Sequence, residues 1–128
     1  MKQPSQAKVV AKNASDGIVY TVKGLNGALL GDGFLVPVGQ YTTGSLQVLN
    51  GNGTTNLSTG AVSIVASNDP EGAISAALPT PISKSEAGLT AAFLLEHAYI
   101  GAEITTVQSG VSLDLYLYLR NGLPQLTA

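Results

Sequence analysis

The fold is decided by residues 111–120, VSLDLYLYLR, near the end of the 128-residue chain. Aliphatic side chains occupy every second position, and polar or amphipathic side chains occupy the positions between them. The aliphatic set is Val111, Leu113, Leu115, Leu117 and Leu119, and the other set is Ser112, Asp114, Tyr116, Tyr118 and Arg120. Successive side chains of a β-strand point to opposite faces of its sheet, so this alternation predicts a strand with one face in a core. A shift of one residue would expose every aliphatic side chain, so the register is specified as well.

Turn signals border this strand on both sides. Ser-Gly at residues 109–110 precedes it, while Asn-Gly at 121–122 and then Pro124 end it. Residues 104–107, ITTV, are rich in β-branched side chains. Because only a short connection separates the two runs, we expect residues 104–107 to pair with the terminal strand as a hairpin.

The first two thirds of the chain contain short strand patterns separated by glycine turns. Residues 8–11 and 18–22 flank Ser-Asp-Gly at 15–17, which predicts a hairpin because Asp-Gly suits a tight turn. Further strands are predicted at residues 34–38, 45–49 and 61–65, and Pro37 indicates an edge or a bulge in the first of them. This spacing predicts a mainly β fold, an antiparallel sandwich or barrel of the jelly-roll-like kind.

Residues 84–97 fit two patterns. Ser83 and Glu86 have the spacing of a capping box, and the Ala and Leu residues that follow share one helical face, which favours a short helix over Lys84–His97. The alternation of Leu89, Ala91, Phe93 and Leu95 also fits a strand, and Gly88 weakens a helix. The sequence favours the helix and leaves the strand as an alternative.

Length predicts a single β-rich domain over residues 7–128, preceded by an N-terminal arm over residues 1–6. The arm is polar and contains Pro4, and Lys2, Lys8 and Lys12 all precede the first acidic residue, Asp16. One interpretation is a solvated terminus. The other is an arm that lies across an acidic neighbour and becomes ordered on assembly.

Charge is scarce throughout the chain. Only 11% of the residues are charged, against about a quarter in an average soluble domain. The net charge of −2 argues against a general nucleic-acid binder, and no apolar run approaches the length of a membrane helix or a secretory signal. We expect neither nucleic acid nor membrane as a partner, and a surface so poor in charge suggests that much of it faces other protein.

The residues needed for catalysis are nearly absent from the sequence. There is no Cys, His97 is the single imidazole, and neither a phosphate-binding glycine loop nor a nucleophile elbow is present. Asp16, Asp32 and Asp69 fall in turns, where an aspartate caps backbone N–H groups. We therefore expect no enzyme, no cofactor and no metal site.

Binding residues are more evident. Tyr116, Tyr118 and Arg120 share the polar face of the terminal strand, and Tyr and Arg are enriched at the centres of protein interfaces. Together with Lys2, Lys8 and Lys12 they form the predicted interface. The alternative is that the tyrosines pack under a second layer of the same domain.

In composition and pattern the whole chain resembles the small virion structural proteins of tailed bacteriophages, of the capsid cement or decoration type. The resemblance consists of low charge, Gly/Thr/Ser-rich strands, the lack of Cys and Trp, a short basic N-terminal arm and a strong terminal strand. It implies a β-sandwich or barrel in the virion that binds and stabilises an assembled capsid shell. Its partners would be the major capsid protein, or another virion protein, and further copies of itself, often as a trimer.

Two other functions remain open from the sequence. One is a different virion component, such as a tail, neck or fibre protein. The other is a β-sandwich module that binds a ligand such as carbohydrate, although Trp is absent and Tyr20, Tyr41 and Tyr99 are scattered along the chain.

Overall fold

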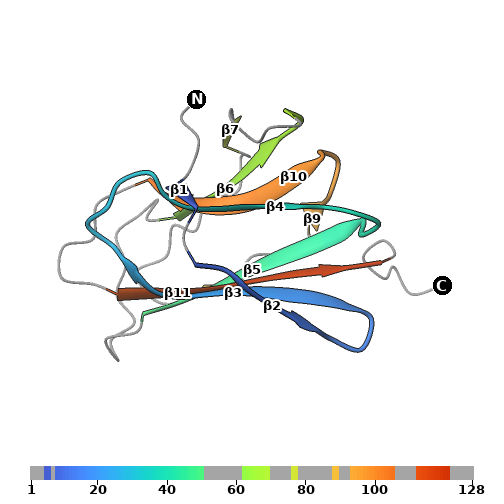
Figure 1. Cartoon of the computed structure of the whole chain (residues 1–128), viewed down its shortest axis with the longest axis horizontal. Coiled ribbons are helices and arrows are strands. Elements are labelled where there is room, and N and C mark those ends of the chain that lie inside the picture. The colour runs from blue at the N-terminus through green and yellow to red at the C-terminus, as the bar shows by residue number, and fades with distance from the viewer. Residues whose placement is uncertain are drawn as a thin grey trace.

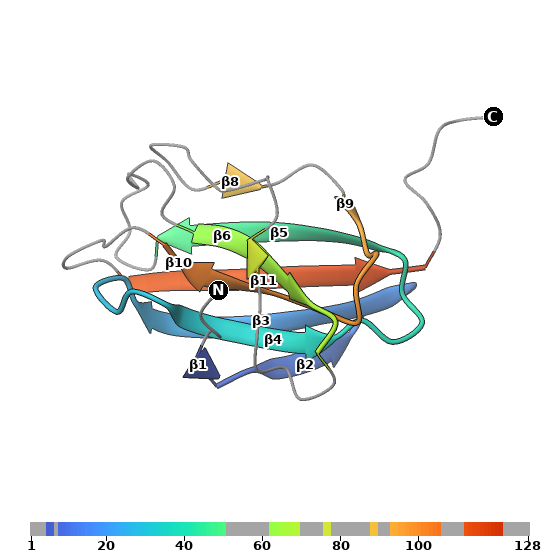
Figure 2. The same ribbon diagram turned by 90° about the horizontal axis from the view of Figure 1, so that it is seen from above.

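The computed structural model describes residues 5–6, 8–50, 62–69, 76–77, 88–89, 93–105 and 112–121. These residues form two facing β-sheets, seen edge-on in Figure 1 and from above in Figure 2. The strands are β1 (Ser5–Gln6), β2 (Val10–Asn13), β3 (Gly17–Asn26), β4 (Asp32–Pro37), β5 (Thr43–Asn50), β6 (Val62–Ser67), β7 (Ala76–Ala77), β8 (Gly88–Leu89), β9 (Phe93–Leu94), β10 (Tyr99–Ile104) and β11 (Ser112–Arg120).

Sheet A has the strand order β1-β4-β10-β6-β7, and sheet B has the order β2-β3-β11-β5-β8, with β9 also paired to β5. Neighbouring strands are antiparallel except β1 and β4, which run parallel. The predicted mainly β fold is confirmed, and the two stacked sheets make it a β-sandwich.

The terminal strand lies in the middle of sheet B. β11 pairs with β3 on one side and β5 on the other, and its burial alternates at every residue as predicted. Leu113, Leu115, Leu117 and Leu119 are all fully buried. They need a partner layer to cover them, and the facing sheet provides it.

The predicted hairpin between residues 104–107 and the terminal strand is wrong. Ile104 ends β10, which lies in sheet A between β4 and β6, whereas β11 belongs to sheet B. The two strands each have two better partners far away in sequence. The chain therefore crosses from one sheet to the other between them.

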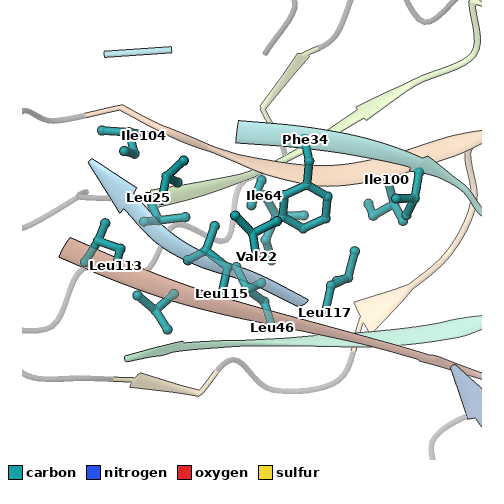
Figure 3. Packing of buried hydrophobic residues seen from close by; sticks show 14 of the residues in the cluster. Val22, Leu25, Phe34, Leu46, Ile64, Ile100, Ile104, Leu113, Leu115 and Leu117 are labelled. Carbon is teal, nitrogen blue, oxygen red and sulfur yellow. The ribbon is translucent and has the colours of Figure 1, made fainter. Parts of the chain in front are cut away.

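Figure 3 shows how the two sheets meet. Phe34 and Ile64 of sheet A point toward Val22 and Leu115 of sheet B. Ile100 of sheet A lies on the side of Leu117 of sheet B, and all six side chains are at most 2% exposed. Each strand contributes alternate residues, because only one face of a strand can reach the core. This shared core fixes the distance between the sheets and leaves their outer faces as separate surfaces.

The first hairpin is confirmed. β2 and β3 pair antiparallel, and in the turn Ala14 N–H donates to the carbonyl of Gly17 at 2.8 Å.

The expected N-terminal arm is only partly described: Ser5 and Gln6 form β1 and pair with Asp32 and Gly33 of the same chain. Residues 1–4, including the predicted interface residue Lys2, lie outside the described residues.

The predicted helix over Lys84–His97 is wrong wherever the structure describes this segment. Residues 88–89 form β8 and residues 93–94 form β9, and both strands pair with β5. β5 lies beside β11 with its other edge open to pairing, so backbone hydrogen bonds to β5 outweigh the modest helix propensity of these residues. Phe93 and Leu95 both pack against the core, which matches the strand alternative.

Candidate functional site

The outer faces of the two sheets differ in exposure. On sheet A the outward residues Val65 and Glu103 are only 0% and 6% exposed. On sheet B the strand β2 is exposed along its whole length, and the outward residues of β11 are half-buried. The outer face of sheet B is therefore the surface on which a partner has room to bind.

The two tyrosines of β11 lie at the centre of this face. Their cross-strand neighbours are Thr21 and Gln47 for Tyr116, and Val19 and Ser45 for Tyr118. An open groove of about 280 Å³, the tyrosine groove, is lined by Val19, Ser45, Gln47, Tyr116 and Tyr118. Since the tyrosines line an open groove, they do not pack under a second layer formed by the described residues.

A second groove adjoins the first on the side of β2. This lysine groove of about 380 Å³ is lined by Lys8, Val10, Lys12, Thr21 and Lys23. The two grooves are neighbours because Lys12 pairs with Val19 and Val10 pairs with Thr21 across the β2–β3 ladder. Rows of outward side chains therefore run from the lysines across β3 to the tyrosines.

A β-bulge in β3 places the third lysine. The pairing of β3 with β11 shifts between Leu113 and Leu115, so that β3 carries one extra residue in this interval. Gly24 has a φ of +71° there, and its N–H donates to the Asp114 carboxylate at 2.9 Å. The bulge lies beside Lys23, which lines the lysine groove on the same face as Lys8 and Lys12.

Tyr118 is tied to the β2–β3 turn. Its phenol O–H donates a hydrogen bond to Oδ1 of Asp16. This bond is the largest cause that raises the pKa of Tyr118 above 10.0, followed by burial and the Asp16 charge, whereas the charge of Arg120 lowers it. The bond links the ring to the turn and favours the protonated phenol.

The pKa of Tyr118 is expected to fall toward 10.0 when Asp16→Ala removes the acceptor. A raised pKa means that the folded state prefers the neutral phenol. The resulting stabilisation is full below the unfolded-state pKa of about 10 and is lost as the pH rises through the folded-state value. The measurement is an absorbance titration of tyrosinate, taken as the difference between each protein and its Tyr118→Phe derivative.

Asp114→Ala is the matched control, because that carboxylate accepts from Gly24 instead of Tyr118. It should leave the pKa of Tyr118 unchanged. An Asp16→Ala protein with the same Tyr118 pKa as the parent would show that this hydrogen bond does not form in solution.

The predicted interface residues come together in part. Lys8, Lys12, Tyr116 and Tyr118 all lie on the outer face of sheet B, and Arg120 is at the end of β11, close enough for its charge to affect Tyr118. The sequence analysis missed Lys23. The signal for it was present, because Lys23 continues the outward alternation of Val19 and Thr21 in the strand predicted beside it.

Sequence analysis also missed Ser45 and Gln47, which line the tyrosine groove from β5.

Among the described residues no group of three or more His, Cys, Asp or Glu side chains could hold a metal ion. In the same part of the chain we find no helix of the length and apolarity required to cross a membrane.

Compared with protein-family profiles, with curated proteins and with solved structures, the chain matches none of them.

Proposed function

We propose that this chain is a non-enzymatic virion structural protein of the capsid cement or decoration type, which binds an assembled shell through the outer face of sheet B. The observation that carries the proposal is the grouping of tyrosines and lysines on three neighbouring strands, in two adjoining open grooves. These residues come from segments separated by about a hundred positions in sequence, as the Tyr118–Asp16 hydrogen bond illustrates.

Rigidity favours this face as an interface. Tyr116 and Tyr118 project from the central strand of a sheet, so little conformational entropy is lost when a partner covers them. Tyrosine combines a large apolar ring with a polar hydroxyl, and it is among the residues that contribute most to binding energy. The scarcity of charge, 11% of residues, lowers the desolvation cost of covering much of the surface.

Stabilisation of a shell would follow from mass action. A protein that binds the assembled lattice and not the free subunit shifts the equilibrium toward the lattice. At a free concentration 100 times its Kd, each occupied site adds about 2.7 kcal/mol to the assembled state. This requires neither a catalytic group nor a cofactor. Further copies of the chain, such as a trimer, would multiply the contacts.

The test is cosedimentation of the purified chain with empty capsid shells of the phage that encodes it, and separately with the same shell protein as unassembled subunits. We expect binding to the shells alone. Tyr116→Ala should weaken this binding about thirtyfold, since truncating a central interface tyrosine removes about 2 kcal/mol. Tyr99→Ala is the matched control, because Tyr99 is also half-buried but belongs to sheet A.

Equal effects of Tyr116→Ala and Tyr99→Ala would place the interface elsewhere. A chain that sediments as a stable monomer and binds no shell would contradict the proposal itself.

A carbohydrate-binding module is the second candidate, and the tyrosine groove is the observation that favours it. Tyr116 and Tyr118 could stack on sugar rings, while Ser45 and Gln47 supply hydrogen-bonding groups beside them. Calorimetric titration with neutral polysaccharides separates the two functions. Heat of binding that disappears in Tyr116→Ala, without any binding to shells, would favour the sugar module.

A further inference from the structure

Positive charge is concentrated in the lysine groove. The chain has six Lys and Arg residues, and three of them, Lys8, Lys12 and Lys23, line this one groove. No carboxylate is among its lining residues, and within the part of the chain that the structure describes these three ammonium groups form no ion pair with an acid. Among the described residues nothing compensates this charge, so the groove offers three ammonium groups to a partner.

The strand that carries this charge is a sheet edge. β2 is the first strand of sheet B and pairs with β3 alone within the described residues. All four residues of β2 are exposed, so its second edge is open to solvent. An open edge offers backbone N–H and C=O groups to an incoming strand, which is a common mode of peptide recognition.

The pairing pattern identifies the backbone groups on that edge. Ala14 and Gly17 are a hydrogen-bonded pair at the turn, and hydrogen-bonded and non-hydrogen-bonded pairs alternate along an antiparallel ladder. Lys12 and Val10 are therefore hydrogen-bonded to β3. The N–H and C=O of Ala11, between them, point to the open edge.

We propose that the lysine groove and the open edge of β2 bind an extended acidic peptide segment of the partner protein, which pairs with β2 as an additional strand of sheet B. The inference rests on the proposed function and names the chemistry of the partner. Carboxylates at two positions of the segment face Lys8 and Lys12. An apolar side chain between them covers Val10, which is 56% exposed.

The register predicts the sequence of the segment. Lys8, Val10 and Lys12 alternate along one face, so their cross-strand partners are also two residues apart. The segment should read acidic, any, apolar, any, acidic. The two intervening residues pair with the backbone at the open edge, including Ala11.

One register of self-pairing is disfavoured at this edge. Antiparallel pairing of two β2 strands about Val10 would place Lys8 of one chain opposite Lys12 of the other. Like charges directly opposite each other on a sheet are destabilising. In this register like charges disfavour a second copy of β2, whereas a segment of opposite charge is favoured.

The competing explanation is that the lysines only prevent aggregation through this edge, which is a common role of lysine on edge strands. The probe that separates the two is the labelled peptide Thr-Glu-Thr-Val-Thr-Glu-Thr, followed by fluorescence anisotropy with the full chain. Two matched peptides serve as controls. One carries Gln in place of both Glu residues, and the other is N-methylated at the two threonines that flank the valine.

We expect the acidic peptide to bind and its affinity to fall with added salt, because exposed charge pairs are screened over about 10 Å at 0.1 M. The Gln peptide should bind about tenfold more weakly, since two exposed ion pairs are lost. The N-methylated peptide should also bind about tenfold more weakly, because it cannot donate to the edge. Lys8→Gln combined with Lys12→Gln should lower the affinity for the acidic peptide and leave the affinity for the Gln peptide unchanged.

Three results would overturn the inference. The acidic peptide does not bind, or the Gln or N-methylated peptide binds equally well. The double lysine variant self-associates in sedimentation while peptide binding is unchanged, which would mean that the lysines act only to prevent aggregation. Polygalacturonate binds the groove more tightly than the peptide, which would make it a site for acidic glycan.

The two proposals fail in distinguishable ways. If the chain cosediments with shells but does not bind the acidic peptide, the proposed function stands and this inference is wrong. If the chain binds the peptide in the expected register but does not bind the shells, the site for an acidic segment stands and the proposed virion role is wrong.

Discussion

Leu115→Ala is expected to lower the free energy of unfolding by about 2–5 kcal/mol. Leu115 is fully buried at the middle of β11, paired with Val22 of β3 and Val48 of β5, both of which are also in the core. Truncation removes buried methyl groups and leaves a cavity. The strands around it cannot move in to close it, because β11 is hydrogen-bonded to β3 on one side and to β5 on the other. Urea denaturation followed by circular dichroism measures the change.

Leu49→Ala is the matched control. It removes the same atoms from the same sheet, but Leu49 lies on the outer face, opposite Asp114, and is 36% exposed. We expect its effect to stay within about 0.5 kcal/mol. Equal losses for the two variants would mean that the inner and outer faces of sheet B have been assigned wrongly.

Gly101→Ala is expected to produce the second large effect. It should lower the free energy of unfolding by at least about 1–3 kcal/mol. Gly101 lies in the middle of β10, between Leu35 of β4 and Val65 of β6. A Cβ added there would lie 1.8 Å from the carbonyl oxygen of Phe34. That atom is backbone in the adjacent strand, so relief requires β4 and β10 to separate and lose ladder hydrogen bonds. Thermal denaturation should show a melting temperature several degrees lower, at about 2–8 °C for each kcal/mol.

Gly44→Ala tests whether the clash with backbone is the cause. A Cβ at Gly44 meets only side-chain atoms, of Phe93, Leu95 and Leu119, at 3.0–3.2 Å. These side chains can shift by a few tenths of an ångström, so Gly44→Ala should cost less than Gly101→Ala. The reverse order would contradict the close approach of β4 to β10.

Stability and binding are separated on opposite faces of one strand. Leu115 and Tyr116 are neighbours on β11, yet the first is in the core and the second lines the tyrosine groove. Variants of the tyrosine should therefore change partner binding with little effect on unfolding. This separation makes the binding experiments interpretable, because a folded protein remains to be tested.

Local patterns in the sequence predicted those parts of the fold that depend on a strand's own residues. The alternation over residues 111–120 predicted the inner face of β11 correctly, and Ser-Asp-Gly at 15–17 predicted the turn between β2 and β3. Within residues 84–97 the described positions 88–89 and 93–97 were predicted wrongly, because helical and strand periodicities overlap there. The open edge of β5 decided between them, and nothing near those residues in sequence reports that edge.

The amino-acid sequence by itself determined that this is a charge-poor β protein, which side of the terminal strand is buried, and that Tyr116 and Tyr118 lie on its other side. Only the tertiary structure decided that β11 pairs with β3 and β5 instead of β10, and that Lys23 joins Lys8 and Lys12 in one groove beside the tyrosines. The physical reason is the range of the interactions. Side-chain alternation is a property of a few consecutive residues, whereas strand pairing is selected by burial of the whole core, in which residues a hundred positions apart compete for the same neighbours.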